Sequence, residues 1–274
     1  MNIKYVNSNG EIINFTKWPL MLSDPEQLIG SEWLYSTSGS NKINNFEKAV
    51  TSKEVTVQIF ADSEGEYKRL LNDLVRITEN DLKKETPGQL EINGYYLECY
   101  ITAGNYGEFE EDFYAAEKKI RVTAEKWIWL KTTRYEFIPE NTLDTDGRGY
   151  PYGYDYDYSM GSGYSNYLNN EHFAPCDFIM KIKGYVIKPS ITIGSHIYRV
   201  NETVQANEVL TIDSKKKSII LTKNNGIEVN IFSKRHKKSY IFEKIQSGKN
   251  KVFWNSGFNF EISLYEERSE PKWM

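Results

Sequence analysis

The sequence predicts a mainly β protein with two domains, of which the first carries one helix and the second is built from strands. The 274 residues include twenty Tyr, thirteen Phe and six Trp, and these aromatic residue types favour strands. Helical periodicity appears once, after Ser63, and fades near Asn80. From Phe173 onward, turn residues recur about every 8–12 positions, the spacing of an antiparallel sandwich or jelly roll.

Length and charge also indicate two domains. The chain is 39% hydrophobic and 26% charged with a net charge of −4, and a globular chain of this length suits one large or two ordinary domains. Residues 1–138 carry 16 Lys and Arg against 22 Asp and Glu, residues 139–172 carry 1 against 6, and residues 173–274 carry 17 against 10. We therefore expect a first domain over 1–138, a Tyr/Gly/Asp-rich linker over 139–172 and a second domain over 173–274.

The first domain is expected to open with a β-hairpin. Apolar residues alternate from Ile3 and again up to Phe15, on either side of a turn at residues 7–10. Alternation also predicts strands at residues 32–35 and 53–60. After the helix we expect strands in QLEINGYYLECYIT, which turns at Asn93-Gly94, and then in DFYAAEKKIRVTAE and KWIWLKTTRYEF.

The helix has a clear start in the sequence. Ser63 is followed three residues later by Glu66, the spacing of a capping box. Apolar residues then recur at helical spacing and predict one buried face. That face comprises Tyr67, Leu70, Leu71, Leu74 and Val75.

Residues 149–158 read GYPYGYDYDY, with tyrosine at every second position: Tyr150, Tyr152, Tyr154, Tyr156 and Tyr158. Side chains of an extended chain alternate between faces, so the five rings would share one face. Left in water, such a row would form a large apolar patch, so the rings are expected to be buried or used for binding. We predict packing between domains or against a neighbouring subunit; a disordered spacer and a sugar-stacking platform are the alternatives.

No motif for catalysis, metal or cofactor binding stands out. His172, His196 and His236 are far apart, and Cys99 and Cys176 have no nearby partner cysteine, so a zinc site is not expected. The DTDG at residues 144–147 opens like a calcium loop but lacks the glutamate that closes one, which favours a polar turn. Nucleotide-binding and nucleophile-elbow motifs are missing, and adjacent carboxylates would point to opposite faces of a strand. We expect no enzyme activity and no cofactor.

The remaining sequence features concern the partners and the cellular compartment of the protein. The basic run at residues 233–238 is expected to be a solvated loop, with an acidic partner protein as the alternative. The N-terminal residues lack the apolar region of a signal peptide, and no run approaches the roughly 20 apolar residues of a membrane span. The two widely separated cysteines fit assembly in a reducing cytoplasm, and we expect no membrane partner.

Two stretches carry a resemblance to a known family. The first, residues 55–101, places a strand, a capped helix and a strand pair in order; the second contains DFIMKIKGYVIKPSITIGSHIYRV, NEVLTIDSKKKSIILTKNNGIEVNIF and the closing LYEERSEPKW. Together they resemble the distal tail proteins (Dit, the Sipho-tail family) of long-tailed, non-contractile phages. The resemblance covers most of the chain, and its motifs are structural rather than catalytic.

The resemblance implies a tail-tube-like β-barrel or sandwich with a packed helix, followed by a galectin-like jelly-roll domain. It implies a homohexameric ring at the virion tail tip, assembled in the host bacterial cytoplasm, between the tail tube protein and the tail-tip hub. The tape measure protein and then DNA would pass through its channel, DNA without specific binding. A receptor-binding protein is a further partner that it implies.

The charge distribution then suggests roles for the two domains. The acidic first domain is expected to border the channel, where like charge keeps DNA from adhering to the wall. The basic second domain is expected to face outward, towards acidic proteins or wall polymers. A carbohydrate-binding adhesion module that contacts the host cell wall is the alternative function.

Overall fold

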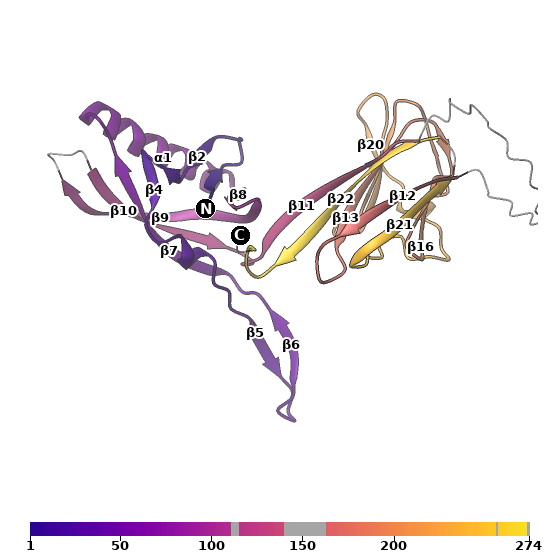
Figure 1. Cartoon of the computed structure of the whole chain (residues 1–274), viewed down its shortest axis with the longest axis horizontal. Helices are drawn as coiled ribbons and strands as arrows, with labels where there is room; N and C mark the ends of the chain where they lie inside the picture. Colours follow the sequence, from indigo (N-terminus) through magenta and orange to yellow (C-terminus); the bar gives the residue numbers. More distant parts are fainter. Residues whose placement is uncertain (111–114, 140–162, 256, 273–274) are drawn as a thin grey trace, which may run out of the picture. The chain divides into compact units, whose positions relative to one another are not determined.

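The computed structural model describes residues 1–110, 115–139, 163–255 and 257–272, and the chain divides into two compact units. Unit 1 comprises residues 1–131 with 267–274, and unit 2 comprises residues 132–266. Strands β11 (Trp129–Phe137) and β22 (Asn259–Arg268) each begin in one unit and end in the other, so the chain passes between the units twice (Figure 1). Residues 267–272 therefore belong with unit 1, whereas the sequence predicts a second domain that runs from 173 to 274.

Unit 1 is built from antiparallel strands that meet at β9. The first half of β9 pairs with β8, and its second half pairs with β10, so that one strand joins two sheets. The sheet orders are β2-β1-β8-β9 and β9-β10-β7-β4-β3. The strands are β1 (Ile3–Val6), β2 (Ile12–Asn14), β3 (Thr16–Lys17), β4 (Leu20–Leu22), β5 (Leu34–Thr37), β6 (Ile43–Glu47), β7 (Thr51–Phe60), β8 (Gly88–Ile92), β9 (Tyr95–Glu110) and β10 (Ala115–Ala124).

Two predicted hairpins of unit 1 are present. In the first, β1 pairs with β2, and the Asn7 carboxamide oxygen accepts the backbone N–H of Glu11 at 2.8 Å within the turn. In the second, Asn93 and Gly94 both adopt positive φ values, 51° and 81°, between β8 and β9. Positive φ at both central residues is what the tight hairpin turn of an Asn-Gly pair requires.

Helix α1 (Glu64–Lys84) starts where the capping box predicts. The Ser63 hydroxyl accepts the N–H of Glu66 at 3.2 Å, and the Glu66 carboxylate accepts the N–H of Asp62 at 3.0 Å. The predicted end near Asn80 is wrong, because the helix runs on to Lys84 and ends at Glu85 in the left-handed conformation.

The extra turn of α1 has a polar cause that hydrophobic periodicity does not register. Asp81 is fully buried and accepts the Tyr5 hydroxyl at 2.6 Å and the backbone N–H of Ser8 at 2.8 Å. Four of the five predicted residues face the core: Leu70 and Leu74 are buried, and Tyr67 and Leu71 pack partly buried against it, joined by the buried Ile77. Buried side chains of the strands and loops surround them, with Trp127 and Trp129 among the largest.

Unit 2 is a sandwich of two antiparallel sheets. One has the order β20-β19-β18-β13-β22-β11, and the other has the order β12-β21-β15-β16. Alternate residues of both sheets fill a shared apolar core that includes Phe178, Met180, Trp254 and Ile262. The strands are β12 (Gly163–Asn170), β13 (Asp177–Lys183), β14 (Val186–Ile187), β15 (Ser190–Ile193), β16 (His196–Arg199), β17 (Thr203–Val204), β18 (Val209–Asp213), β19 (Ser218–Thr222), β20 (Glu228–Asn230) and β21 (Gly248–Asn255).

The predicted linker over residues 139–172 is wrong in its last part. Residues Gly163–Asn170 form β12, which pairs with β21 at all eight positions. Leu168 is fully buried, and the Asn170 amide donates to the carbonyls of Ile245 and Gln246 at 3.0 and 3.2 Å. The sequence GYSNYLNN resembles a turn-rich linker, but pairing with β21, the buried Leu168 and the Asn170 amide hold it in the sheet. The wider prediction, a mainly β chain with one packed helix, is confirmed.

Candidate assembly interface

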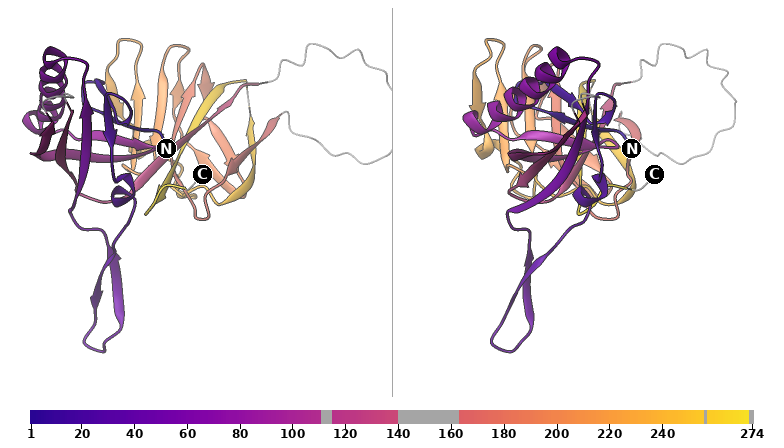
Figure 2. Two further views of the ribbon diagram at one scale, coloured as in Figure 1. Left: turned by 60° about the vertical axis from the view of Figure 1, so that its left-hand side comes forward. Right: turned by 90° about the vertical axis from the view of Figure 1, so that its left-hand side faces the viewer.

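The hairpin β5–β6 stands out in unit 1 because it forms a sheet of its own. Leu34 pairs with Glu47, Tyr35 with Phe46, and the register shifts by one residue after Ser36. The turn is closed by hydrogen bonds from the Ser38 N–H to the Lys42 carbonyl at 2.8 Å and from the Asn41 N–H to the Ser38 carbonyl at 2.9 Å, and Asn41 takes a positive φ of 57°. Figures 1 and 2 show these two strands extending away from the rest of unit 1.

Every strand residue of this hairpin is exposed. Tyr35 is 64% exposed and Phe46 58%, although both are large aromatic residues. An isolated two-stranded sheet is marginally stable in water, and exposed apolar surface of this kind marks a contact with another molecule. The large apolar side chains on and beside the hairpin are Trp33, Leu34, Tyr35, Ile43, Phe46 and Val50.

The base of the hairpin, in contrast, is fixed to unit 1. The Trp33 indole N–H donates to the Ser269 hydroxyl at 3.1 Å, and the Lys48 ammonium lies 4.4 Å from the centre of the Trp33 ring. Lys48 also donates to the carbonyl of Glu32 at 2.8 Å. Beneath, the Lys53 ammonium lies 4.7 Å from the ring centre of the buried Trp127.

Partial burial lowers the pKa of the Lys48 and Lys53 ammonium groups, although the nearby Glu270 carboxylate opposes the shift. Both groups stand against aromatic rings and backbone carbonyls rather than in open water. The hairpin therefore combines an anchored base with a projecting, apolar arm, which is the arrangement expected of an element that reaches a second molecule.

A second surface of unit 1 is the outward face of β9, β10 and β7. The hydroxyls of Ser52, Thr123 and Thr102 form a chain across the three strands at 2.8 and 2.9 Å. On the same face Arg121 is paired with Glu54 across β10 and β7. This face is polar and has exposed cations beside exposed carboxylates, so it has little to offer an apolar partner.

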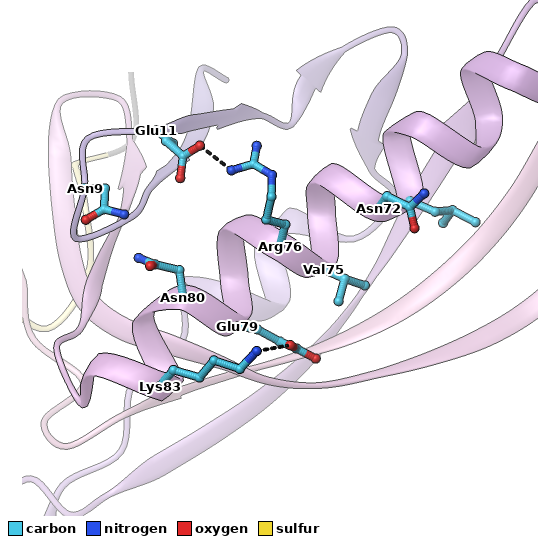
Figure 3. A pocket seen from close by; sticks show the side chains of 9 residues that line it. Asn9, Glu11, Asn72, Val75, Arg76, Glu79, Asn80 and Lys83 are labelled. Carbon is cyan, nitrogen blue, oxygen red and sulfur yellow. Dashed lines mark hydrogen bonds and ion pairs between the residues drawn. The ribbon is translucent and has the colours of Figure 1, made fainter.

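A hollow of about 530 Å³ lies along the solvent side of α1, where the β1–β2 turn faces the helix (Figure 3). Leu71 and Val75 contribute apolar surface to it. Its charged groups are paired with one another, Arg76 with Glu11 and Lys83 with Glu79 at 3.2 Å. The charged groups that line the hollow are therefore engaged in ion pairs with one another.

Some of the candidate residues predicted from the sequence lie outside the described residues, and others are buried. The tyrosine row of Tyr150, Tyr152, Tyr154, Tyr156 and Tyr158 lies outside the described residues, as does the DTDG turn. Cys99 and Cys176 are free and buried, and burial raises their pKa to about 12 and about 11.

Two of the histidines have structural surroundings, and the basic run is largely exposed to solvent. The His196 ring contacts the carbonyl of Tyr240 at 2.8 Å, and His172 is buried. Within the described residues, His, Cys, Asp and Glu form no cluster of three or more that could hold a metal ion. Phe232–Lys234 form one turn of 3-10 helix, and Lys234, Lys237 and Lys238 are exposed. In the described part of the chain, no helix is long and apolar enough to cross a membrane.

The exposed hairpin was missed as a site, although its sequence contains two signals. WLYST and INNFE contain aromatic and β-branched residues and flank the turn residues SGSN, the pattern of a hairpin. Strong apolar residues on both faces of both strands then mean that no face is destined for solvent. That combination distinguishes an arm awaiting a partner from an ordinary surface hairpin.

Comparison with known proteins finds solved structures with a similar fold. No family model and no curated protein matches the sequence. Among solved structures, the chain is similar to the Dit protein of phage SPP1, described as a paradigm of the hub adsorption apparatus in phages that infect Gram-positive bacteria. The TM-score is 0.56 at 10% identity, over 97% of this chain and 98% of that one.

Two structures of the phage P2 baseplate in its activated conformation, with Ca and with Sr, are also similar. Each gives a TM-score of 0.55 at 14% identity, over 98% of this chain and 99% of the other. The matches thus cover both units. The resemblance inferred from the sequence is confirmed for the fold: the chain has the fold of a phage distal tail protein.

Proposed function

We propose that this chain is a structural hub protein of a phage tail tip. In this role it forms a homohexameric ring between the tail tube protein and the tail-tip hub, in the virion tail. The observation that carries the proposal is the apolar β5–β6 hairpin, anchored at its base and exposed along both strands. The fold shared with the SPP1 Dit protein and the P2 baseplate supports it.

The hairpin supplies a reason for self-assembly. Cyclic rings arise when one patch of each copy meets a different patch of the next, and the rotation closes. A projecting arm with exposed aromatic residues suits such a contact, because aromatic side chains dominate the energy of protein interfaces. The neighbouring copy would cover Tyr35 and Phe46, which the single chain leaves in water.

Passage of the tape measure protein and of DNA through the ring belongs to the same proposal. DNA would pass without specific binding; among the described side chains on the face of β9, β10 and β7, the hydroxyls of Ser52, Thr102 and Thr123 lie beside Arg121, whose charge is paired with Glu54. The acidic channel wall expected from the sequence stays a proposal. Among the described side chains of this face, Arg121 and Lys119 offset Glu54 and Glu117.

The protein is proposed to be non-enzymatic, with assembly in the bacterial cytoplasm before incorporation into the virion. The tape measure protein, the tail-tip hub and a receptor-binding protein are its proposed partners besides the tail tube protein. The tyrosine row of residues 150–158 remains proposed as packing between domains or subunits.

Light scattering coupled to size exclusion, together with negative-stain microscopy, tests the ring. The purified chain is expected to form hexamers with a central hole at micromolar concentration, alone or with the tail tube protein. The double variant Tyr35→Ser/Phe46→Ser is expected to stay monomeric, because it removes the two largest exposed rings of the arm.

A matched control is Phe173→Ser/Tyr185→Ser, which removes two rings of similar exposure, 77% and 59%, from unit 2. It should assemble like the parent chain. Monomers under every condition, or hexamers that persist in the hairpin variant, would contradict the role given to the arm.

A further inference from the structure

The outward face of the sheet β12-β21-β15-β16 in unit 2 combines exposed rings with exposed lysines. Tyr167 is 53% exposed and Phe253 42%, and Lys249 and Lys251 are exposed beside them. These four residues are called the cationic aromatic face below. Their strands, β12 and β21, are neighbours in Figure 1.

The pairing register places these side chains together. Tyr167 lies directly opposite Lys251. Val252 and Trp254, which alternate with Lys251 and Phe253 along β21, are buried in the core, so Lys249, Lys251 and Phe253 share the outward face. Successive outward residues of one strand stand roughly 7 Å apart. The face therefore presents two ammonium groups at a regular spacing with a ring next to each.

Contacts within the face hold the ammonium groups in position. The Lys249 nitrogen lies 4.0 Å from the centre of the Tyr167 ring, and the Lys251 nitrogen lies 5.5 Å from the centre of the Phe253 ring. A cation over an aromatic ring is attracted to it and loses part of its freedom. Both lysines are thus oriented above the sheet without being neutralised.

Charge on this sheet is of one sign. The sequences of its four strands contain Lys249, Lys251, Arg199 and His196 and no Asp or Glu. The other sheet of unit 2 differs, because there Lys183 and Arg134 converge on the nearly buried carboxylate of Glu261. Within the described residues, Lys249 and Lys251 have no such carboxylate partner, so their charge is available to a ligand.

We propose that the cationic aromatic face binds an anionic polysaccharide, a glycan chain that carries carboxylate or phosphate groups at regular intervals. The two ammonium groups would pair with successive anionic groups of the polymer. The ring surfaces, with Ile197 and Thr192 on the neighbouring strands, would contact the C–H faces of the sugars. The binding is a property of unit 2 alone and does not depend on the proposed ring.

Other polyanions fit this face less well. Nucleic acid is held by a broad basic stripe that contacts many phosphates, whereas two lysines on one strand span a short distance. An acidic protein surface would need a larger apolar area to bury than two rings provide. A flat sheet face with rings, hydroxyls and a few charges matches a sugar chain of moderate charge density.

The test uses the full-length chain and three soluble polymers in affinity electrophoresis: hyaluronan, neutral dextran and poly-glutamate of similar length. Retardation is expected with hyaluronan and not with dextran, and it should weaken as salt rises from 0.05 to 0.5 M, concentrations chosen to shorten the Debye length about threefold. Lys249→Ala/Lys251→Ala should weaken the hyaluronan interaction by about tenfold or more. Tyr167→Ser/Phe253→Ser should weaken it by about fivefold at unchanged net charge.

The matched control is Lys181→Ala/Lys183→Ala, which removes the same charge from the outward face of the opposite sheet. It should bind hyaluronan like the parent chain. Equal losses of hyaluronan affinity in both lysine variants, or equal retardation by poly-glutamate, would mean that the chain attracts polyanions through charge alone. Either result would overturn the proposal. No retardation by hyaluronan would overturn it as well, whatever the oligomeric state of the chain.

Discussion

The Trp33 indole donates its Nε1 proton to the Ser269 hydroxyl at 3.1 Å, across 236 positions of sequence. The donor stands at the base of the β5–β6 hairpin, and the acceptor directly follows β22. The Lys48 ammonium packs on the same indole ring and secures the other strand at its base. The arm that is proposed to reach a neighbouring copy is thus held by the last residues of the chain.

Trp33→Phe is expected to loosen the base of the hairpin, because it removes the hydrogen bond to Ser269 and leaves a smaller ring beneath the Lys48 ammonium. The loss should be below about 1 kcal/mol, since the bond is exposed. Hydrogen exchange of the amides in β5 and β6 should become faster. Ser269→Ala removes the same bond from the other side, so the double variant should exchange no faster than Trp33→Phe alone. Additive effects would show that the bond is not what holds the base.

The hairpin also shows what a sequence can and cannot predict. The capped helix and the Asn93-Gly94 turn follow from local rules, and both are present. The strand expected at residues 32–35 begins at Leu34, but its exposure and its role as a contact surface were not predicted. Alternation identifies a strand when one face is buried within the same chain. All strand residues of this arm are exposed, so the information on which face matters lies in another molecule.

The two other departures have different physical causes. The last turn of α1 depends on the buried carboxylate of Asp81, a polar residue that a hydrophobic pattern counts as surface. Strand β12 depends on pairing with β21, almost ninety residues later in the chain, and its own composition is that of a loop. Residues far apart in the sequence determine both the end of α1 and the formation of β12, and local sequence patterns give little information about such contacts.

The capping box makes a direct prediction for stability. Ser63→Ala removes the hydroxyl that accepts the Glu66 N–H, and it should lower the free energy of unfolding of unit 1 by about 1 kcal/mol. Ser40→Ala, in the exposed turn of the hairpin, is the matched control and should change it by less than about 0.5 kcal/mol. Urea unfolding monitored through the helical circular dichroism signal measures both. Equal effects would mean that the cap contributes nothing.

Tyr5→Phe should destabilise unit 1 more strongly. The Tyr5 phenol is fully buried, burial raises its pKa, and it donates to the buried Asp81 carboxylate at 2.6 Å. Removing the hydroxyl leaves one carboxylate oxygen without that donor, at a cost of about 1–3 kcal/mol. Tyr35→Phe, on the exposed arm, should have no measurable effect on unfolding. An equally small effect at Tyr5 would show that water replaces the lost donor.

A buried polar network in unit 2 should make its stability depend on pH. The Asp177 carboxylate accepts the Ser214 hydroxyl at 2.8 Å and pairs with the Lys244 ammonium at 2.8 Å, while the Ser214 oxygen accepts the N–H of Phe178. Burial acts to raise the pKa of Asp177, but the hydrogen bonds from Lys244 and Ser214 prevail and lower it.

Since the folded-state pKa of Asp177 lies below the unfolded value of about 3.9, the charged carboxylate stabilises the fold above that pH. The stabilisation is lost as pH falls through the folded-state pKa. Asp177→Asn should therefore cost about 1–3 kcal/mol at pH 7, and the difference from the parent chain should shrink below about pH 4. Hydrogen exchange of the β13 amides across urea and pH series would measure it. Glu228→Gln, on the exposed strand β20, is the control, and its stability should match that of the parent chain at each pH. If the stability difference between Asp177→Asn and the parent stays constant down to pH 2, shape rather than charge holds the network together.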